Sequence, residues 1–345
     1  MLTSDQNRKI NEIVEEFKEA ADFYRMEYSE DLMGMFRDFG CMLLLKCKVD
    51  TEGKADLERL LEGRHKLKGT VKRQLMTVSE ELAQLWEPGE QDGSGDTGEY
   101  EGSQNVREMF QTALEEIFHF CLYSKGGKNR YLLPEETAKP LLRLLTFPEG
   151  MMAGNEGLVV LDTQCGAGSA LMAASRYLKN LRLMGYEKDE EMWAAAVIMS
   201  QLSGLEMELH LEDGARADLY ESCDLVISNP VYGTDTIKDE ELIDQLPGEL
   251  KTVRGRYHME LIRSMQALNF DGKAMLIVPN SFLFANRTES MKVRKWLLQS
   301  YSLEAIISLP EDTFMYSGVR SGVMVFSKPF MSGGWEGHTQ RVLYY

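Results

Sequence analysis

The sequence predicts an α/β protein in which a small helical domain precedes a doubly wound, mostly parallel sheet. Three observations support this fold class. Apolar residues recur at helical spacing through the first 86 residues. A stretch rich in Gly, Asp and Glu interrupts that pattern at 87–105. After Gly157, short apolar runs alternate with helical segments, as expected for parallel strands joined by helices that cover both faces of a sheet.

The domain boundaries follow from these changes in composition. Residues 1–86 are predicted to form a helical N-terminal domain, because their apolar residues repeat at helical spacing and no proline precedes Pro88. Residues 87–105 are predicted to be an acidic, Gly-rich linker or loop. Helical patterning then resumes, and we assign residues 106–345 to the second domain.

The second domain is predicted to alternate strands with helices. Strands are expected at 158–162, 183–187, 207–212, 224–228, 274–278, 303–309 and 322–326, and helices at 170–178, 190–202, 259–268 and 291–299. In doubly wound sheets, ligands bind beyond the carboxyl ends of the strands, where the strand order reverses. The residues that follow each strand are therefore the candidate functional residues.

The bulk composition limits the possible functions. A net charge of −17 argues against strong autonomous binding to a phosphate backbone, although a local basic groove or a basic partner could supply such contacts. No stretch approaches the roughly 18 apolar residues of a membrane span. The five cysteines form no CxxC pair, so neither a disulfide framework nor a metal site is expected. We therefore predict a cytoplasmic protein without membrane association.

Residues after the first three strands suit a nucleotide-like ligand. Gly166 and Gly168 follow the strand that ends at Asp162, and they let the backbone turn sharply and approach a ligand. A simple strand-to-helix turn would explain these glycines equally well. Glu187 ends the second strand, where a carboxylate can accept hydrogen bonds from two ribose hydroxyls. Asp213 follows the third strand and could accept from an adenine amino group or cap a turn.

The fourth strand runs into Asn229-Pro230-Val231-Tyr232. A planar amino group is a poor nucleophile, because its lone pair is delocalised into the ring. Two acceptors aimed at its hydrogens, such as the Asn229 side-chain oxygen and the Pro230 carbonyl, can draw it towards a tetrahedral geometry. Tyr232 could stack against a base taken out of a helix. The alternative is an ordinary Asn-Pro turn at a strand end.

In this order, the segments resemble the N6-adenine DNA methyltransferases, most closely the modification subunit of type I restriction-modification systems. The family's D-P-A-C-G-S-G motif corresponds to Asp162–Gly168, which reads DTQCGAG. Its N-P-P-F/Y-G motif corresponds to NPVYG at 229–233, and its F-T-P segment to Tyr131–Pro134. Further similar segments lie at 272–279, 293–298, 303–310 and 317–323.

The resemblance implies a Rossmann-like class I methyltransferase fold. It implies methyl transfer from S-adenosylmethionine to adenine N6 in DNA, with no metal ion. Asn229 and Pro230 would bind the target amino group and Tyr232 would stack on the base. The implied cofactor-binding residues are Asp162, Gly166, Gly168, Glu187, Asp213 and Pro134. The implied partners are DNA, reached through a separate specificity subunit, and a restriction subunit.

Two alternatives remain open at this point. The Asn-Pro-x-Tyr motif also occurs in enzymes that methylate protein glutamine or the amino groups of RNA bases. Alternatively, the chain could be an inactive structural subunit that still binds the cofactor. Leu133 and Val231 replace a threonine and a proline of the family motifs, which is the observation behind the second alternative.

The segment at 233–256 mixes Lys and Arg with Asp and Glu. It can be interpreted as a loop that contacts substrate or as a solvated surface insertion. His258 follows this segment, and we expect it to be a helix-capping or surface residue rather than a catalytic base.

Overall fold

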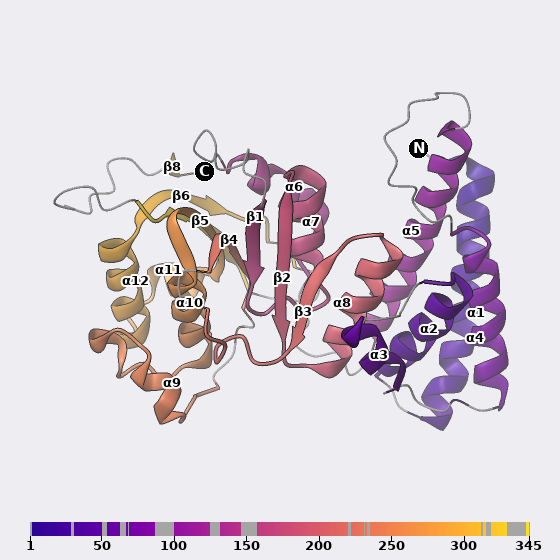
Figure 1. Ribbon diagram of the computed structural model, residues 1–345, viewed down its shortest axis with the longest axis horizontal. Helices are drawn as coiled ribbons and strands as arrows, with labels where there is room; N and C mark the ends of the chain where they lie inside the picture. The colour runs from indigo at the N-terminus through magenta and orange to yellow at the C-terminus, as the bar shows by residue number, and fades with distance from the viewer. Residues whose placement is uncertain are drawn as a thin grey trace. The chain divides into compact units, whose positions relative to one another are not determined.

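The computed structural model divides the chain into two compact units (Figure 1). The helical unit comprises Met1–Arg130 and Ala194–Leu205, and the sheet unit comprises Tyr131–Trp193 and Glu206–Tyr345. The structure describes residues 2–28, 31–49, 54–62, 67, 69–86, 100–124, 132–145, 157–219, 222–230, 232, 235–311, 313–314, 319–329 and 343–344.

The helical unit is built around buried aromatic side chains. Its helices are α1 (Ser4–Glu27), α2 (Met33–Lys46), α3 (Ala55–Glu62), α4 (Gly69–Ala83) and α5 (Tyr100–Leu122), together with α8 (Glu190–Leu202) from Ala194 onward. Phe17 of α1 meets Phe39 of α2 edge to face, with 5.0 Å between ring centroids. Phe36 of α2 lies 5.1 Å from Phe118 of α5. Edge-to-face and tilted ring pairs of this kind stabilise a core beyond the area that they bury.

The start of the second domain differs from the prediction. We expected the α/β domain to begin at residue 106, but α5 packs on α1 and α2 and belongs to the helical unit. Its buried residues Phe110 and Ile117 explain this, because they complete the core of the helical unit. The helix also occupies the last part of the predicted linker, and residues 87–99 lie outside the described residues.

The sheet unit has the doubly wound, mostly parallel sheet that the sequence predicts. Its strands are β1 (Leu158–Asp162), β2 (Leu181–Glu187), β3 (Met207–Leu211), β4 (Cys223–Ser228), β5 (Leu268–Pro279), β6 (Ser302–Ser308), β7 (Ser321–Ser327) and β8 (Leu343–Tyr344). They are ordered β3-β2-β1-β4-β5-β7-β6-β8. Only β7 runs antiparallel to its neighbours among the described strands. The strand order reverses between β1 and β4, which marks the expected position of a ligand site.

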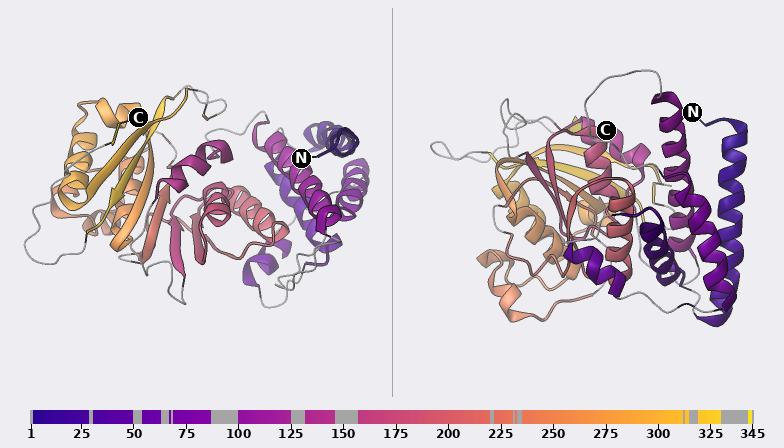
Figure 2. Two further views of the ribbon diagram at one scale, coloured as in Figure 1. Left: turned by 90° about the horizontal axis from the view of Figure 1, so that it is seen from above. Right: turned by 45° about the vertical axis from the view of Figure 1, so that its right-hand side comes forward.

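Helices cover the sheet in this unit (Figure 2). They are α6 (Glu135–Arg143), α7 (Ser169–Tyr177), α9 (Glu240–Asp244), α10 (Arg256–Gln266), α11 (Asn280–Phe284) and α12 (Thr288–Ser300), with a short 3₁₀ turn at Gly248–Leu250. α7 packs on β1 and β2, and α10 on β4 and β5. Leu161, Val226 and Leu276 share a buried cluster with α10 and α12. In the described parts of the chain, no helix combines the length and apolar character needed to cross a membrane.

The largest difference from the predicted elements concerns β5. The sequence predicts this strand at 274–278, but it begins at Leu268, directly after α10. Asp271 has a φ of 62°, and its backbone N–H donates to the Lys328 carbonyl at 2.6 Å. The pairing with β4 shifts register at this point. The polar residues of this irregular stretch interrupt the apolar run, so the apolar pattern revealed only the regular end of the strand.

Candidate active site

Parallel pairing brings the predicted site residues to one edge of the sheet. β2 pairs with β3 and β1, and β1 pairs with β4, all in parallel. Asp162 and Glu187 are the last residues of β1 and β2, Asn229 follows β4, and Asp213 lies just beyond β3. The carboxyl ends of parallel neighbours meet at one edge, so all four residues lie there.

The turn after β1 depends on two glycines in left-handed conformations. Gly166 has a φ of 56° and Gly168 a φ of 79°, a region that residues with a Cβ adopt at a cost. Gly168 is the N-cap of α7 and offers no side chain to the helix N–H groups. The Cys165 N–H donates to the Tyr186 carbonyl at 2.9 Å, which ties the turn to β2. The two glycines and this hydrogen bond therefore fix the path of the chain from β1 to α7.

Glu187 is held in place by the same turn. Its Oε2 accepts from the Gly166 N–H at 3.0 Å, and its Oε1 accepts from the Asp189 N–H at 2.7 Å. Burial raises the pKa of this carboxyl and the charge of Asp189 adds to the shift, whereas the backbone N–H groups of Asp189, Gly166 and Lys188 oppose it. Each carboxylate oxygen has a further lone pair. Glu187 can therefore still accept two hydrogen bonds from a ligand.

Asp162 lies beneath the turn and is 2% exposed. Its Oδ1 accepts from the Gln164 N–H at 3.0 Å. Burial raises its pKa to about 7, the Gln164 N–H opposes the shift, and the charge of Glu187 adds to it. Desolvation disfavours the ionised carboxylate in this position, so Asp162 changes charge near neutral pH.

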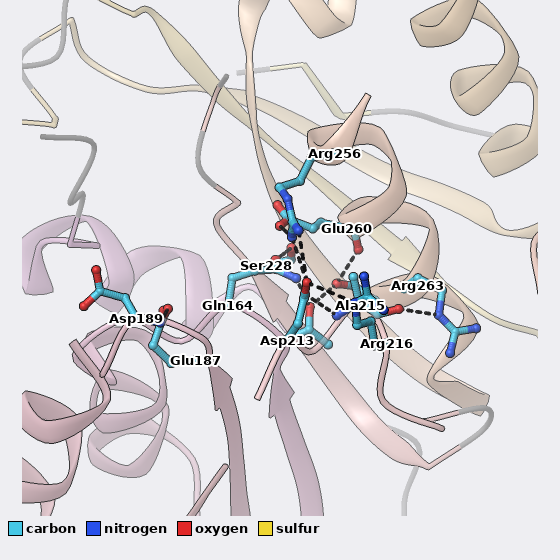
Figure 3. Close-up of polar contacts among 12 residues, drawn as sticks. Gln164, Glu187, Asp189, Asp213, Ala215, Arg216, Ser228, Arg256, Glu260 and Arg263 are labelled. Atoms are coloured by element: carbon cyan, nitrogen blue, oxygen red, sulfur yellow. Dashed lines mark hydrogen bonds and ion pairs between the residues drawn. The ribbon is translucent and has the colours of Figure 1, made fainter. Parts of the chain in front are cut away.

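Asp213 is bound by Arg256, the last residue of the 233–256 segment. Both Nη atoms of Arg256 donate to Oδ2 of Asp213 at 3.0 Å (Figure 3). Oδ1 accepts from the Ala215 N–H at 3.2 Å. A carboxylate has about four lone-pair sites, so one site on Oδ1 remains for a ligand. A possible signal for this role was the four-residue spacing of Arg256 and Glu260, which suits an ion pair on one helix face.

α10 also holds the loop that follows β3. Arg256 Nη1 donates to Glu260 Oε1 at 3.1 Å. Glu260 is 4% exposed, and burial raises its pKa to about 7 against the opposing effect of Arg256. Arg263 donates to the carbonyl of Ala215 at 3.0 Å and to that of Ala217 at 2.7 Å. These contacts fix the loop that carries Asp213.

The Asn-Pro-x-Tyr segment leaves β4 at the same edge. Asn229 is half-buried and Pro230 is buried, whereas Val231 lies outside the described residues. The Tyr232 hydroxyl lies 3.3 Å from the Ser321 hydroxyl. Its ring meets that of Tyr257 edge to face, with 5.6 Å between centroids. The tyrosine is therefore held at both its hydroxyl and its ring.

The segment before α6 is attached to the start of α7. Pro134 is the N-cap of α6, and the Leu133 N–H donates to the Ser169 hydroxyl at 3.2 Å. Pro134 is thereby placed near the glycine turn. Tyr131, the first residue of the matching sequence segment, lies outside the described residues.

The described part of the 233–256 segment is anchored rather than a simple surface insertion. Glu289 accepts from the backbone N–H groups of Arg254 at 2.9 Å and Gly255 at 3.1 Å. The expectation that His258 is a capping or surface residue was wrong. Its side chain is 16% exposed, and its Nε2 lies 2.9 Å from the Ser290 hydroxyl of α12. Burial lowers its pKa. Through its contact with Ser290, this histidine connects α10 with α12.

A family model described as N-6 DNA Methylase matches residues 107–345. The methylase subunit of the type I restriction enzyme MjaVII from Methanocaldococcus jannaschii is 24% identical over 298 residues, which cover 79% of this chain and 47% of that protein. The chain therefore spans about half the length of this relative.

Solved structures share the fold. A protein from Listeria monocytogenes assigned to the class I S-adenosylmethionine-dependent methyltransferases aligns with a TM-score of 0.66 and 18% identity, covering 98% of this chain and 92% of that one. The methyltransferase subunit of a type I restriction-modification system from Streptococcus thermophilus aligns with a TM-score of 0.59 and 17% identity, covering 93% and 86%. The class I methyltransferase fold is therefore common to all three chains.

The buried carboxyl of Asp162 predicts a pH-dependent stability difference. Its pKa is raised from 3.8 to about 7, so its stabilising contribution is complete below pH ~4 and is lost as the pH rises through 7. Asp162→Asn retains the Oδ1 acceptor and carries no charge. We expect the variant to be more stable than the wild type at pH 8 by on the order of 2 kcal/mol, and the difference to vanish near pH 4.

Urea denaturation at both pH values measures this difference. Glu206→Gln, at an exposed carboxylate of the same unit, is the control and should change stability little at either pH. A wild type that is more stable than Asp162→Asn at pH 8 would contradict the assignment.

Proposed function

The chain belongs to the N-6 DNA methylase family, and we propose that it transfers a methyl group from S-adenosylmethionine to the N6 amino group of adenine in DNA. One observation carries this proposal: the Gly166 turn with Glu187 and the Asn229-Pro230 segment lie at one sheet edge, on either side of the reversal in strand order. We infer that the chain acts as the modification subunit of a restriction-modification system.

The residues at the ends of β1, β2 and β3 fit the cofactor. Glu187 is fixed by two backbone N–H groups and keeps acceptor sites for two ribose hydroxyls. Asp213 keeps one acceptor site on Oδ1, which suits a single adenine N–H. Asp162, Gly166 and Gly168 shape the turn beside the methionine and ribose, and Pro134 borders the methionine end. When bound, S-adenosylmethionine supplies an electrophilic methyl group on a sulfonium centre.

The Asn-Pro-x-Tyr residues act on the target base. The Asn229 side-chain oxygen and the Pro230 carbonyl accept the two amino hydrogens and thereby localise the nitrogen lone pair for attack. Tyr232, held by Ser321 and Tyr257, stacks on the base after it leaves the duplex. The surplus proton leaves after methyl transfer, so no strong base is required. Orientation and electrostatics therefore provide the rate enhancement.

Sequence recognition is assigned to a partner. The net charge of −17 opposes the many phosphate contacts that independent DNA binding needs. Extracting a base from a duplex costs a few kcal/mol, which a chain with few phosphate contacts cannot offset. A separate specificity subunit would supply both the sequence reading and most of the backbone contacts.

Cofactor binding should depend on Glu187. Calorimetry with S-adenosylmethionine should show binding that Glu187→Gln weakens about tenfold or more, because a lost hydrogen bond to a charged acceptor costs roughly 1.5–3 kcal/mol. Glu212→Gln changes the exposed carboxylate that follows β3 and should leave the affinity unchanged. Absence of binding by the folded wild-type chain would remove the cofactor from the proposal, and equal affinities of the two variants would remove Glu187 from the site.

Methyl transfer should depend on Asn229. We expect Asn229→Ala to reduce the rate by about a hundredfold or more, the usual effect of losing one preorganised hydrogen-bonding group, with unchanged cofactor affinity. The assay uses the chain isolated with its native partners and DNA from bacteria that lack adenine methylation, and mass spectrometry identifies the product.

Asn286→Ala, at an exposed asparagine after α11, is the control for this assay and should leave the rate unchanged. Methylation of protein or RNA instead of DNA would reject the proposed substrate. Equal loss of methyl transfer and cofactor affinity in Asn229→Ala would place Asn229 in the cofactor pocket.

The isolated chain should bind DNA weakly and without site preference. A titration at about 150 mM salt is suitable, because the Debye length is then about 8 Å and long-range attraction is screened. Adding the specificity subunit should create a preference for one site. Tight, sequence-specific binding by the chain alone would overturn the assignment of recognition to a partner.

A further inference from the structure

The turn after β1 carries two polar side chains that its motif does not require. The family pattern D-P-A-C-G-S-G has Pro and Ala where this chain has Thr163 and Gln164. Both side chains take part in one run of hydrogen bonds that leaves the turn and reaches β4 and α10.

The run contains four hydrogen bonds. The Ser228 hydroxyl donates to Gln164 Oε1 at 3.5 Å. Gln164 Nε2 donates to the Thr163 hydroxyl oxygen at 2.6 Å. The Thr163 and Ser264 hydroxyls lie 2.5 Å apart, and the Ser264 hydroxyl donates to the Glu260 carbonyl at 2.8 Å. Side chains from β4, the turn and α10 are thereby joined.

The direction of this run fixes the orientation of the Gln164 amide. The Glu260 carbonyl can only accept, so Ser264 uses its hydrogen there and accepts from Thr163. The Thr163 oxygen must then accept from an amide nitrogen, which can only donate. Oε1 of Gln164 consequently faces Ser228. A flipped amide would place two acceptors or two donors against each other.

The run is buried at both of its ends. Ser228 and Ser264 are both 0% exposed, and Thr163 is 2% exposed. A buried hydroxyl left without a partner costs roughly 1–3 kcal/mol, so these groups hold the half-buried Gln164 amide in one position. Gln164 is the only member of the run that spans from the turn to β4.

Backbone pairing between β1 and β4 does not reach the carboxyl ends of these strands. β1 and β4 are paired at Val160–Leu225 and Leu161–Val226, before the carboxyl end of either strand. Beyond these pairs, the described contact between the turn and the end of β4 is the Gln164–Ser228 hydrogen bond. Ser228 pairs with Leu276 of β5 and directly precedes Asn229, so this contact ties the cofactor turn to the point where the target-binding segment begins.

We propose that Gln164 is a positioning residue for methyl transfer: its amide sets the separation between the cofactor turn after β1 and the Asn229-Pro230 segment after β4. This inference rests on the proposed function and deepens it. Gln164 acts through Ser228 and touches neither ligand. Its loss should misplace the target amino group relative to the methyl donor without removing any group that binds the cofactor.

The test separates catalysis from binding. Gln164→Met keeps the length and flexibility of the side chain but lacks the amide, and Ser228→Ala removes the other half of the contact. Each should lower kcat about tenfold or more, because misplacement by about 1 Å can cost a hundredfold in rate. The Kd for S-adenosylmethionine should remain close to that of the wild type, and the melting temperature should fall by only a few degrees, because one buried hydrogen bond is lost. Gln299→Met, at an exposed glutamine of α12, is the matched control.

The double variant identifies the route of the effect. If Gln164 acts through Ser228, the Gln164→Met/Ser228→Ala protein should be no slower than the slower single variant, because contacting residues are not additive. The assay again uses the native complex and DNA from bacteria lacking adenine methylation. Additive losses, an unchanged kcat, or a parallel loss of cofactor affinity would each overturn the positioning role.

The two proposals fail in different ways. A wild-type complex that methylates no DNA would reject the proposed function and this inference with it. A wild-type complex that methylates DNA as fast as its Gln164→Met variant would reject only the inference. Should Gln164→Met fail to fold, Gln164→Asn, which keeps the amide but is too short to reach Ser228, provides the same comparison.

Discussion

The parallel pairing of β1 with β4 determines where both halves of the candidate site lie. The glycine turn continues from β1 and the Asn-Pro-x-Tyr segment from β4. In the proposed reaction, the geometry between these two strands would therefore set the geometry between methyl donor and acceptor. Among the described residues, only two pairs join β1 and β4 through the backbone, and side-chain hydrogen bonds join these strands on either side of those pairs. Asp224 accepts from the Val159 N–H at 3.0 Å at the amino end, and Gln164 meets Ser228 at the carboxyl end.

α10 provides a second support for the same edge. Arg256, Glu260 and Ser264 are spaced four residues apart and therefore share one helix face. Through this face α10 binds Asp213 after β3 and Thr163 after β1. One helix thereby fixes the loops on both sides of the proposed cofactor site. The position of α10 depends in turn on α12, through the contact between His258 and Ser290.

The site concentrates buried carboxyls in a chain that is already acidic. Asp162 and Glu260 both have pKa values raised to about 7, mainly by burial, and Glu187 is shifted in the same direction. Such environments destabilise ionised groups, and they persist where the arrangement of a site requires them. Because the site is acidic and the chain has a net charge of −17, surfaces other than this site must attract DNA. This agrees with the assignment of sequence recognition to a partner.

The sequence by itself determined the strand and helix order and the identity of the strand-end residues. Asp162, Glu187 and Asn229 were singled out as candidates because buried parallel strands are continuous apolar runs, and polar residues directly after such runs are conspicuous. Only the tertiary structure decided which residues at the site contact one another through their side chains. Arg256 and Asp213 are 43 residues apart, and Gln164 and Ser228 are 64 apart. No periodic pattern connects residues at such separations, because their contact arises only when the sheet brings distant strand ends together and α10 docks against them. The helical boundary was misplaced for the same reason: α5 has the pattern of any amphipathic helix, and only its packing on α1 and α2 shows which unit it belongs to.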